Sequence, residues 1–345
     1  MKIFLLSALT LLINTWLFAT IITVDNSVPS MGNYSTLQSA YDVATNGDTL
    51  YLYPSMTPFT AISMSKKLIL IGAGFKAPQA GVKFTKISGT MTMAAGSDGS
   101  VINGFGGGFE VIIDANIITI KRNLINNLKI LQNHYGNAII QNYIKSEYSG
   151  YNIEIQGQNE VLISNNIIRN YAINQMGPGL FVYSGKGIRA NQLPITITIR
   201  NNVIDLFLPA GNWGNGYDIA MDLGSSNASV INNIIISGSI YGLMDGYFYN
   251  MGWVYPAMPG ANFNINNADR TSVFVDFQAE DYHLKPGSPA LGAGQNGSDM
   301  GAYGGDFPFV DYGYPEIPVI YFLEVPTVGT QQEGLDIRVK ARSNN

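Results

Sequence analysis

The chain has 345 residues, of which 46% are hydrophobic and only 12% are charged, about half of the roughly 25% charged share that is usual in soluble domains. Its 38 Gly and 34 Asn residues take the place of the missing charges. A chain with so large an apolar share and so little charge is not disordered. The absence of Cys excludes disulfide frameworks, thiolate zinc sites and a cysteine nucleophile. The net charge of −5 argues against nucleic acids and anionic membranes as partners, because both select basic patches.

The N-terminus reads as a secretory signal peptide spanning residues 1–20. One basic residue precedes an apolar run, which ends at Ala19 in a small-residue cleavage site. The alternative is an uncleaved membrane anchor, because Ile21 and Ile22 lengthen the apolar stretch. Asn14 within the run favours the cleaved signal. We therefore expect a secreted, periplasmic or cell-surface bacterial protein with no integral membrane span after signal removal.

A short amphipathic helix is predicted next. Residues 35–38 fit a capping box, and the apolar residues between 37 and 44 fall on one face at helical spacing. Gly47 is expected to end this helix, and a strand is expected to begin at Thr49. Such a helix covers the open end of a stack of strands, whose edge groups would otherwise stay unpaired.

The middle of the chain repeats one phrase, in which an apolar residue is followed by two variable residues, Asn and two further apolar residues. The repeated asparagines are Asn123, Asn142, Asn166, Asn202 and Asn233. An earlier copy has Gly104 in place of Asn. From 104 to 233 the successive positions are 19, 19, 24, 36 and 31 residues apart, which indicates stacked repeats lengthened by insertions.

The chemistry of each repeat predicts a solenoid of strands. The apolar runs are short, rich in Ile and Val, and alternate as strands do. Asn or Gly between two runs supplies the left-handed backbone position of a tight bend. Asn side chains stacked about 4.8 Å apart would form an amide ladder. We therefore predict an all-β fold, a right-handed parallel β-helix solenoid over residues 21–305, with an N-terminal capping helix.

The remaining residues, 306–345, are predicted to form a short C-terminal β appendix. Two strand-like runs, 319–325 and 335–341, flank a segment at 329–334 that can close a hairpin. An end cap is the simpler interpretation of this appendix, and a pair of strands that docks a partner is the alternative.

Several phrases resemble those of a known superfamily. They are Tyr34–Tyr41 with Asn46–Leu52, Lys66–Gly72, the Asn phrases, Asp281–Ala290 and Ser298–Gly304. Over residues 23–305 the chain resembles the right-handed parallel β-helix, pectin-lyase-like superfamily of secreted bacterial proteins. The resemblance implies that fold. It implies no particular activity, since members include polysaccharide lyases, hydrolases and proteins without known activity, and every matched phrase belongs to the scaffold.

The longest intervals between repeats are expected to hold the functional residues, because loops there can screen a strand face. In the second of them, Asp218 and Asp222 would point to one side of a strand. They could act as acid and base in glycoside hydrolysis or bind calcium, and Trp213 and Tyr217 could stack on sugar rings. The alternative is that both carboxylates bond backbone amides at turns. The Asp-Asp pattern of polygalacturonases is missing.

The preceding interval holds two cations, Lys186 and Arg189. A polysaccharide lyase needs a base and a cation that stabilises the enolate, and in β-helix lyases Lys or Arg fills these roles. The Gly-rich context favours a shared loop over a shared strand face, and solvated loop charges are the simpler interpretation. Glu147, Glu154 and Glu160 could accompany them as metal ligands.

Aromatic residues gather between 241 and 255. Asp245, Tyr247, Tyr249 and Trp253 could line a sugar-stacking wall, or they could form the packed interior of an insertion. His134 and His283 lack companion ligands at useful spacing, so no metal site is predicted. We expect no cofactor, and no specific motif supports calcium.

Two functions remain as hypotheses from the sequence. The first is an exported protein that binds, and could process, an acidic polysaccharide; if it is an enzyme, it is a polysaccharide lyase or a glycoside hydrolase. The alternative is a non-catalytic cell-surface, adhesion or structural β-helix protein. The sequence predicts no oligomeric state.

Overall fold

The computed structural model describes residues 19–77, 82–157, 159–171, 173–177, 180–190, 196–206, 218–224, 227–242, 244–324 and 337–342. Most of the predicted signal peptide therefore lies outside the described residues. No helix among these described segments has the length and apolarity needed to cross a bilayer.

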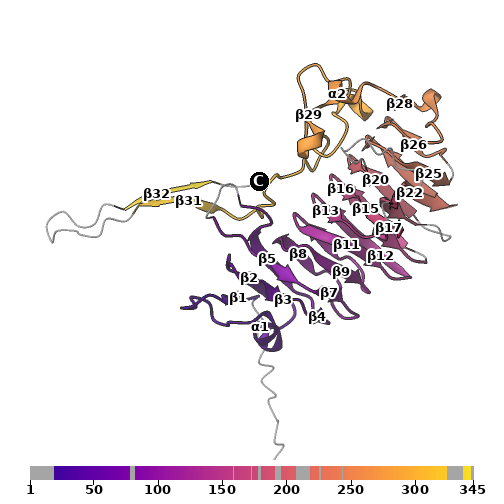
Figure 1. Ribbon diagram of the computed structural model, residues 1–345. Coiled ribbons are helices and arrows are strands. Elements are labelled where there is room, and N and C mark those ends of the chain that lie inside the picture. Colours follow the sequence, from indigo (N-terminus) through magenta and orange to yellow (C-terminus); the bar gives the residue numbers. More distant parts are fainter. Residues whose placement is uncertain are drawn as a thin grey trace, which may run out of the picture.

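A ten-stranded parallel sheet runs the length of the molecule and forms the first face of each coil (Figure 1). Its strands, in stacking order, are β1 (Ile21–Val24), β2 (Thr49–Leu52), β5 (Ile69–Gly74), β8 (Val101–Phe105), β10 (Thr119–Lys121), β12 (His134–Ile140), β15 (Asn159–Ser164), β20 (Thr196–Arg200), β23 (Asn227–Ile231) and β26 (Tyr247–Phe248).

A fourteen-stranded parallel sheet forms the rest of the coils and divides into two arms at β11 (Leu124–Ile130). Towards the N-terminus β11 is followed by β9 (Phe109–Ile113), β7 (Thr90–Met93) and β4 (Ser63–Met64). The β13 arm contains β13 (Tyr143–Ser146), β16 (Ile167–Asn170), β21 (Val203–Asp205), β24 (Ile234–Ile235), β27 (Met251–Gly252) and β28 (Ile265–Asn266). The β14 arm contains β14 (Tyr151–Ile155), β19 (Lys186–Arg189), β22 (Ile219–Gly224) and β25 (Ser239–Gly242).

Along the chain, each of the later coils passes from the ten-stranded sheet to the β13 arm and then to the β14 arm. The predicted all-β parallel β-helix is thereby confirmed. Short two-stranded sheets decorate it: β3 (Phe59–Thr60) with β6 (Ile87–Ser88), β17 (Ile173–Gly177) with β18 (Leu180–Tyr183), β29 (Phe274–Asp276) with β30 (Asp281–Leu284), and β31 (Val319–Glu324) with β32 (Arg338–Arg342). The chain after β27 also forms a short helix, α2 (Arg270–Val273), and 3-10 turns at Gly260–Asn262, Phe277–Ala279 and Gln295–Gly297.

The core is a continuous stack of inward side chains. One column runs through aligned positions of the ten-stranded sheet, each of them almost fully buried: Leu50, Leu70, Ile102, Ile120, Ile139, Ile163, Ile199, Val230 and Tyr247. The alternation of strand side chains places every second Ile or Val inside. Because neighbouring coils add to the same column, burial accumulates along the solenoid as expected for stacked repeats.

Helix α1 (Leu37–Val43) covers the first coil, as predicted, although its ends differ from the prediction. The N-cap is Thr36, whose hydroxyl accepts a hydrogen bond from the Ser39 amide at 3.1 Å. The helix ends before Ala44 rather than at Gly47, which has a φ of +97° in the turn that follows. Leu37 is buried against the open end of the core.

The predicted amide ladder is present and longer than the repeats suggested. At each step the backbone amide and the side-chain amide of one asparagine both donate to the Oδ1 of the next. The ladder asparagines are Asn123, Asn142, Asn166, Asn202, Asn233, Asn250 and Asn264. The donor–acceptor distances lie between 2.8 Å and 3.1 Å. All seven side chains are buried, so the ladder satisfies backbone groups that water does not reach.

The left-handed position of each bend belongs to the residue before the ladder asparagine, which corrects the sequence interpretation. Arg122, Gln141, Asn165, Asn201 and Asn232 have φ angles of 55°, 58°, 55°, 53° and 59°. We call these five residues the anchor row. In the earlier copy Gly104, with a φ of +85°, occupies the anchor position, and the Phe105 amide donates to the first ladder asparagine. The sequence analysis therefore aligned Gly104 with the ladder asparagines, one residue away from its true place in the anchor position.

Beyond the last coil the chain turns back and runs along the anchor row towards the first coils (Figure 1). We call residues 295–316 the strap. Its carbonyls at Asp299, Ala302, Pro308 and Tyr314 accept hydrogen bonds from successive anchor side chains: Asn201 at 3.1 Å, Asn165 at 2.9 Å, Gln141 at 2.6 Å and Arg122 at 2.8 Å. The beginning of the predicted appendix is thus packed on the solenoid.

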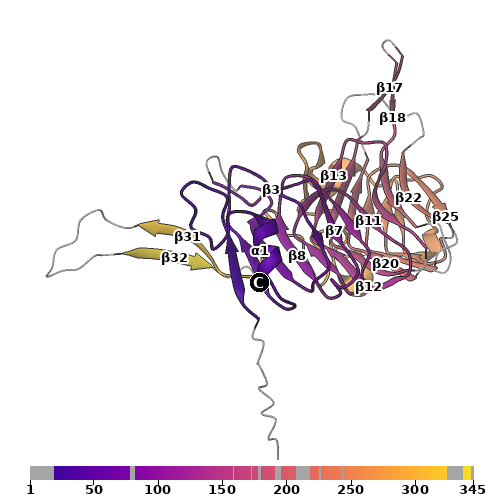
Figure 2. The ribbon, with the colours of Figure 1, turned by 90° about the horizontal axis from the view of Figure 1, so that it is seen from below.

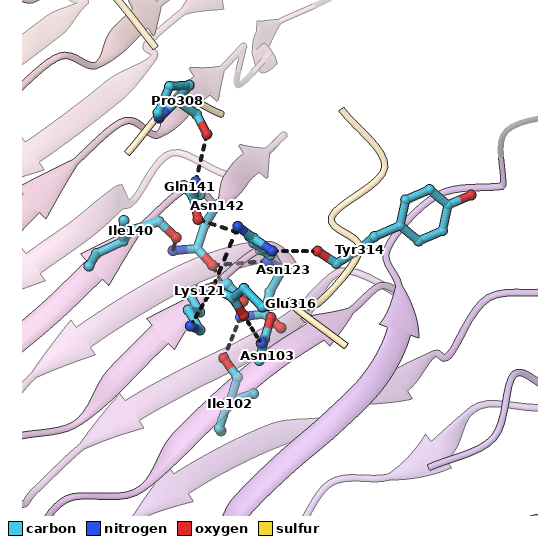
Figure 3. Close-up of polar contacts among 11 residues, drawn as sticks. Ile102, Asn103, Lys121, Asn123, Ile140, Gln141, Asn142, Pro308, Tyr314 and Glu316 are labelled. Carbon is cyan, nitrogen blue, oxygen red and sulfur yellow. Dashed lines mark hydrogen bonds and ion pairs between the residues drawn. The ribbon is translucent and has the colours of Figure 1, made fainter. Parts of the chain in front are cut away.

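The strap ends in an ionic clasp near the first coils. Glu316 pairs with Lys121 at 2.7 Å and with Arg122 at 3.5 Å, and it accepts a hydrogen bond from Asn103 at 3.0 Å (Figure 3). Strands β31 and β32 then form an antiparallel ribbon that projects away from the body in Figures 1 and 2. The loop expected at 329–334 lies outside the described residues.

Candidate functional site

Insertions gather at the corner between the two arms of the large sheet. They separate β13 from β14, β16 from β19, and β21 from β22. The second insertion contains the hairpin β17–β18, which projects from the body in Figure 2. The outer face of the β14 arm lies beside this corner, and it holds the charged residues that the sequence singled out.

Four side chains meet on this face, and we call them the Tyr151 cluster: Tyr151, Lys186, Arg189 and Asp222. Tyr151 and Lys186 are register partners on β14 and β19, and Arg189 and Asp222 are partners on β19 and β22. The Lys186 ammonium lies 5.6 Å and the Arg189 guanidinium 5.5 Å from the centre of the Tyr151 ring, within the range of a cation–π contact.

Asp222 connects the two halves of the cluster. Its Oδ2 accepts a hydrogen bond from the Tyr151 hydroxyl at 3.3 Å and lies 3.8 Å from Arg189 Nε. Burial, reinforced by the Asp222 carboxylate, raises the pKa of Tyr151 to about 12. The phenol is therefore a protonated hydrogen-bond donor at neutral pH. Within the part of the chain that the structure describes, Lys186 makes no ion pair.

The face continues on both sides of the cluster. Towards the C-terminus, Tyr241 on β25 is the register partner of Asp222, and it is 50% exposed. Towards the N-terminus, Glu154 precedes Arg189 in the same row and pairs with Lys129 on β11 at 3.8 Å. Positive and negative side chains therefore alternate across successive strands in the row Lys129, Glu154, Arg189 and Asp222, which ends at the exposed Tyr241.

The positions of Lys186 and Arg189 correct the sequence interpretation. Both residues lie on strand β19 rather than in a shared loop. Residues three positions apart on a regular strand point to opposite faces. Here the two residues between Lys186 and Arg189 are both buried, and both cations lie against the Tyr151 ring. Glycine is uncommon inside strands, so the Gly-rich sequence did not indicate one here. Gly187 is nevertheless required in β19, because a Cβ at this position would collide with the Ala220 carbonyl oxygen.

The two aspartates do not form a matched pair of carboxylates. Asp218 precedes β22, and its Oδ1 accepts a hydrogen bond from the Gly185 amide at 2.7 Å. Burial raises the pKa of Asp218, and this hydrogen bond opposes the rise. The turn interpretation therefore describes Asp218, whereas Asp222 faces Tyr151 and Arg189. Trp213 and Tyr217, which were expected beside them, lie outside the described residues.

The predicted aromatic wall is mainly packed interior. Tyr247 is only 1% exposed, and burial raises its pKa well above the usual range of a tyrosine. The Tyr249 ring stacks on Phe263 at 4.9 Å, and Trp253 Nε1 donates to the Ala268 carbonyl at 2.5 Å. Asp245 is exposed in a turn. The ligand-binding role predicted for Tyr247 is thus wrong, because its ring has no free surface.

A second charged group is buried where residues 280–284, which we call the closing segment, pack on the β13 arm. Arg169 and Asp205 are register partners, 3.6 Å apart from Nε to Oδ2, and both are buried. Tyr282 donates to Asp205 at 2.6 Å, and Glu280 pairs with Arg169 at 2.5 Å and with Lys145 at 2.8 Å. This network joins strand β30 and the turn before it to three coils, and it leaves little surface for a ligand.

The described residues contain no group of three or more His, Asp or Glu side chains that could hold a metal ion. His134 pairs with Asp114 at 3.0 Å, and His283 pairs with Asp281 at 2.8 Å. The three glutamates considered as ligands are dispersed: Glu154 pairs with Lys129, and Glu147 accepts a hydrogen bond from Tyr171 at 2.9 Å.

Sequence reasoning missed Tyr151, and it placed Tyr241 only within the aromatic group at 241–255. The available signal was their alignment with Lys186 and Asp222, but that alignment depends on the lengths of the insertions between strands. A tyrosine at the start of a strand also has no distinctive pattern of its own, since aromatic residues are common in strands.

Comparison with protein-family models finds no match, and neither does comparison with curated proteins. Among solved structures, the chain is similar to the crystal structure of pectate lyase Pel9A, with 12% sequence identity and a TM-score of 0.37. The alignment covers 82% of this chain and 96% of that one. The strand pairing of the chain itself, rather than this similarity, establishes the β-helix.

Proposed function

We propose that the chain is an exported protein that binds an acidic polysaccharide on the outer face of the β14 arm, with the Tyr151 cluster at its centre. The observation that carries this proposal is the position of Lys186. Its ammonium lies against the Tyr151 ring on a strand face, without an ion pair among the described residues. A uronate carboxylate would supply the missing counter-charge.

The neighbouring groups suit a sugar ligand. Arg189 is the second cation of the cluster, and its side chain is 40% exposed. The exposed Tyr241 ring extends the same face by one coil. Cations paired with flat rings match a chain of sugar units that carries carboxylates along its length, because carboxylates attract the cations and the rings cover apolar sugar faces.

The same geometry favours binding over cleavage. A tyrosine could act as the base of a lyase only if it lost its proton at working pH, but the raised pKa keeps Tyr151 protonated. Asp222 is held by Tyr151 and Arg189, and Asp218 is held by a backbone amide. The two carboxylates therefore have different partners and do not form the acid–base pair of a glycosidase.

A non-catalytic adhesion or surface role is the second candidate. It is favoured by the ribbon of β31 and β32, which projects from the body (Figures 1 and 2) and is available to contact another surface.

The test of the binding proposal is affinity electrophoresis and calorimetry with polygalacturonate and alginate, with dextran as the uncharged polymer. We expect retardation by at least one uronate polymer. Lys186→Ala should weaken binding by about tenfold or more, the order expected when one charged hydrogen bond is lost.

Lys76→Ala is the matched control, since Lys76 is exposed and lies outside the cluster. Ultraviolet absorbance of unsaturated products and reducing ends are followed in the same samples. Equal affinity of Lys186→Ala and wild type would overturn the assignment of the site, and product formation would replace binding by lyase or hydrolase activity.

A further inference from the structure

A separate open cavity of about 420 Å³ lies beside β11 and β13. It is lined by Gly108, Leu124, Asn126, Lys145, Glu147 and Tyr148. These residues come from the turn before β9, from β11 and β13, and from the turn that leads to β14. None of them belongs to the Tyr151 cluster.

Of the two charged residues in this lining, Lys145 has a counter-ion, whereas Glu147 has none among the described residues. Lys145 Nζ lies 2.8 Å from a Glu280 oxygen, so its ammonium has a counter-ion. Glu147 accepts a hydrogen bond from the Tyr171 hydroxyl at 2.9 Å, and its other carboxylate oxygen has no side-chain partner among the described residues. The cavity therefore offers a fixed carboxylate and a paired ammonium, and it has no unpaired cation that would select an anion.

Asn126 adds a polar group with unused hydrogen-bonding capacity. Its side-chain amide has no hydrogen-bond partner in the described part of the chain. It lies against Gly108, where a Cβ would come within 2.7 Å of Asn126 Oδ1 and where φ is +66°. The glycine thus keeps space beside an amide that can both donate and accept.

Tyr148 and Leu124 supply the apolar part of the lining. Tyr148 is 67% exposed, although its backbone amide is held by Ser146 Oγ at 3.1 Å. An exposed ring beside a carboxylate and an amide combines a flat apolar surface with groups that accept and donate hydrogen bonds. This combination is typical of sites that place a few polar groups on an apolar wall.

We infer that this cavity binds a neutral sugar residue. A carboxylate accepts hydrogen bonds from neighbouring hydroxyls, an amide exchanges both kinds of hydrogen bond, and a tyrosine ring covers the apolar face of a pyranose. Because Lys145 is already paired and the Glu147 carboxylate would repel a second carboxylate, the cavity favours an uncharged unit over a uronate. For its ligand class the inference rests on the proposed function, which it extends: the glycan would present neutral units to this cavity and acidic units to the Tyr151 cluster.

The experiment uses the full chain and neutral tetrasaccharides derived from galactan, mannan, xylan and glucan. Saturation-transfer NMR and calorimetry report binding. We expect at least one tetrasaccharide to bind, and Tyr148→Ala and Glu147→Gln should each weaken it by about tenfold or more, as expected for loss of a wall or of a hydrogen bond to a charged group. Tyr135→Ala removes another exposed tyrosine and should change nothing.

The outcomes separate this inference from the proposed function. Lys186→Ala should leave the affinity for the neutral tetrasaccharide unchanged while it weakens uronate binding. No binding of any neutral tetrasaccharide, or binding that survives both cavity variants, would overturn the inference even if uronate polymers bind. Neutral binding that follows the cavity variants, without any uronate binding, would support the cavity and remove the Tyr151 proposal.

Discussion

At the scale of single residues, two adjacent positions in each bend have different tasks. The ladder asparagine turns inward and satisfies buried backbone groups. Asn166, for example, donates to Asn202 Oδ1 and to the Ile139 carbonyl at 2.8 Å. The anchor residue before it adopts the left-handed conformation, which costs a residue other than Gly of order 1 kcal/mol or more. The hydrogen bonds of the ladder, together with those made by the anchor side chains to the strap, offset this strain.

We expect Asn166→Ala to destabilise the protein by about 2–4 kcal/mol, because it leaves the buried backbone amide of Asn142 without its acceptor and removes the side-chain hydrogen bonds from Asn166 to the Ile139 carbonyl and to Asn202. Denaturant unfolding measures the loss. Asn227→Ala makes the same chemical change at an exposed strand position and should stay within about 0.5 kcal/mol of wild type. Similar losses in the two variants would contradict a stabilising role of the ladder.

At the scale of elements, the closing segment is attached to the solenoid through charge as well as through apolar packing. Glu280 meets Tyr143 and Lys145 on β13 and Arg169 on β16. Burial alone would raise the pKa of Glu280, but its hydrogen bonds and the nearby cations outweigh burial and lower it. The lowered pKa means that the folded state favours the ionised carboxylate more than the unfolded chain does.

The sign of the pH dependence follows from this shift. The stability that Glu280 contributes is complete above its unfolded pKa of about 4.3 and is lost as the pH falls through the lower folded value. Glu280→Gln should therefore be less stable than wild type at pH 7, and the difference should shrink as the solution is acidified. Thermal melting between neutral and acidic pH tests this, with the exposed Glu160→Gln as control. A difference that stays constant with pH would contradict it.

At the scale of the whole molecule, the strap links the last coils to the first. The anchor row holds it along successive coils, and Phe75 donates to the Tyr312 carbonyl at 2.9 Å near its end. Repeats that contact only their neighbours can open one after another. The strap adds contacts between residues that are far apart in the sequence, such as the 167 positions that separate Gln141 from Pro308.

The sequence predicted those features that each coil repeats, namely the parallel solenoid, the ladder and the capping helix. It did not predict the strap, because the anchor position accepts Arg, Gln or Asn and its partner is distant in the chain. It predicted Lys186, Arg189 and Asp222 as candidate site residues. It did not predict their contact with Tyr151, because the insertions at the corner have different lengths and the strand register cannot be read across them. It left Tyr247 open between an exposed wall and a packed interior, because spacing alone does not distinguish a core ring from an exposed one.

Release of the clasp should loosen one end of the strap and leave the other end docked. Glu316→Ala removes the ion pairs with Lys121 and Arg122 and the hydrogen bond from Asn103. Hydrogen exchange should therefore become faster in residues 306–318, while residues 299–304 keep their protection because Asn165 and Asn201 still hold them. The exposed Glu160→Ala should leave both segments unchanged. Uniform protection of the strap in Glu316→Ala would show that the anchor row holds it without the clasp, whereas loss along its whole length would show that the strap docks as one cooperative unit.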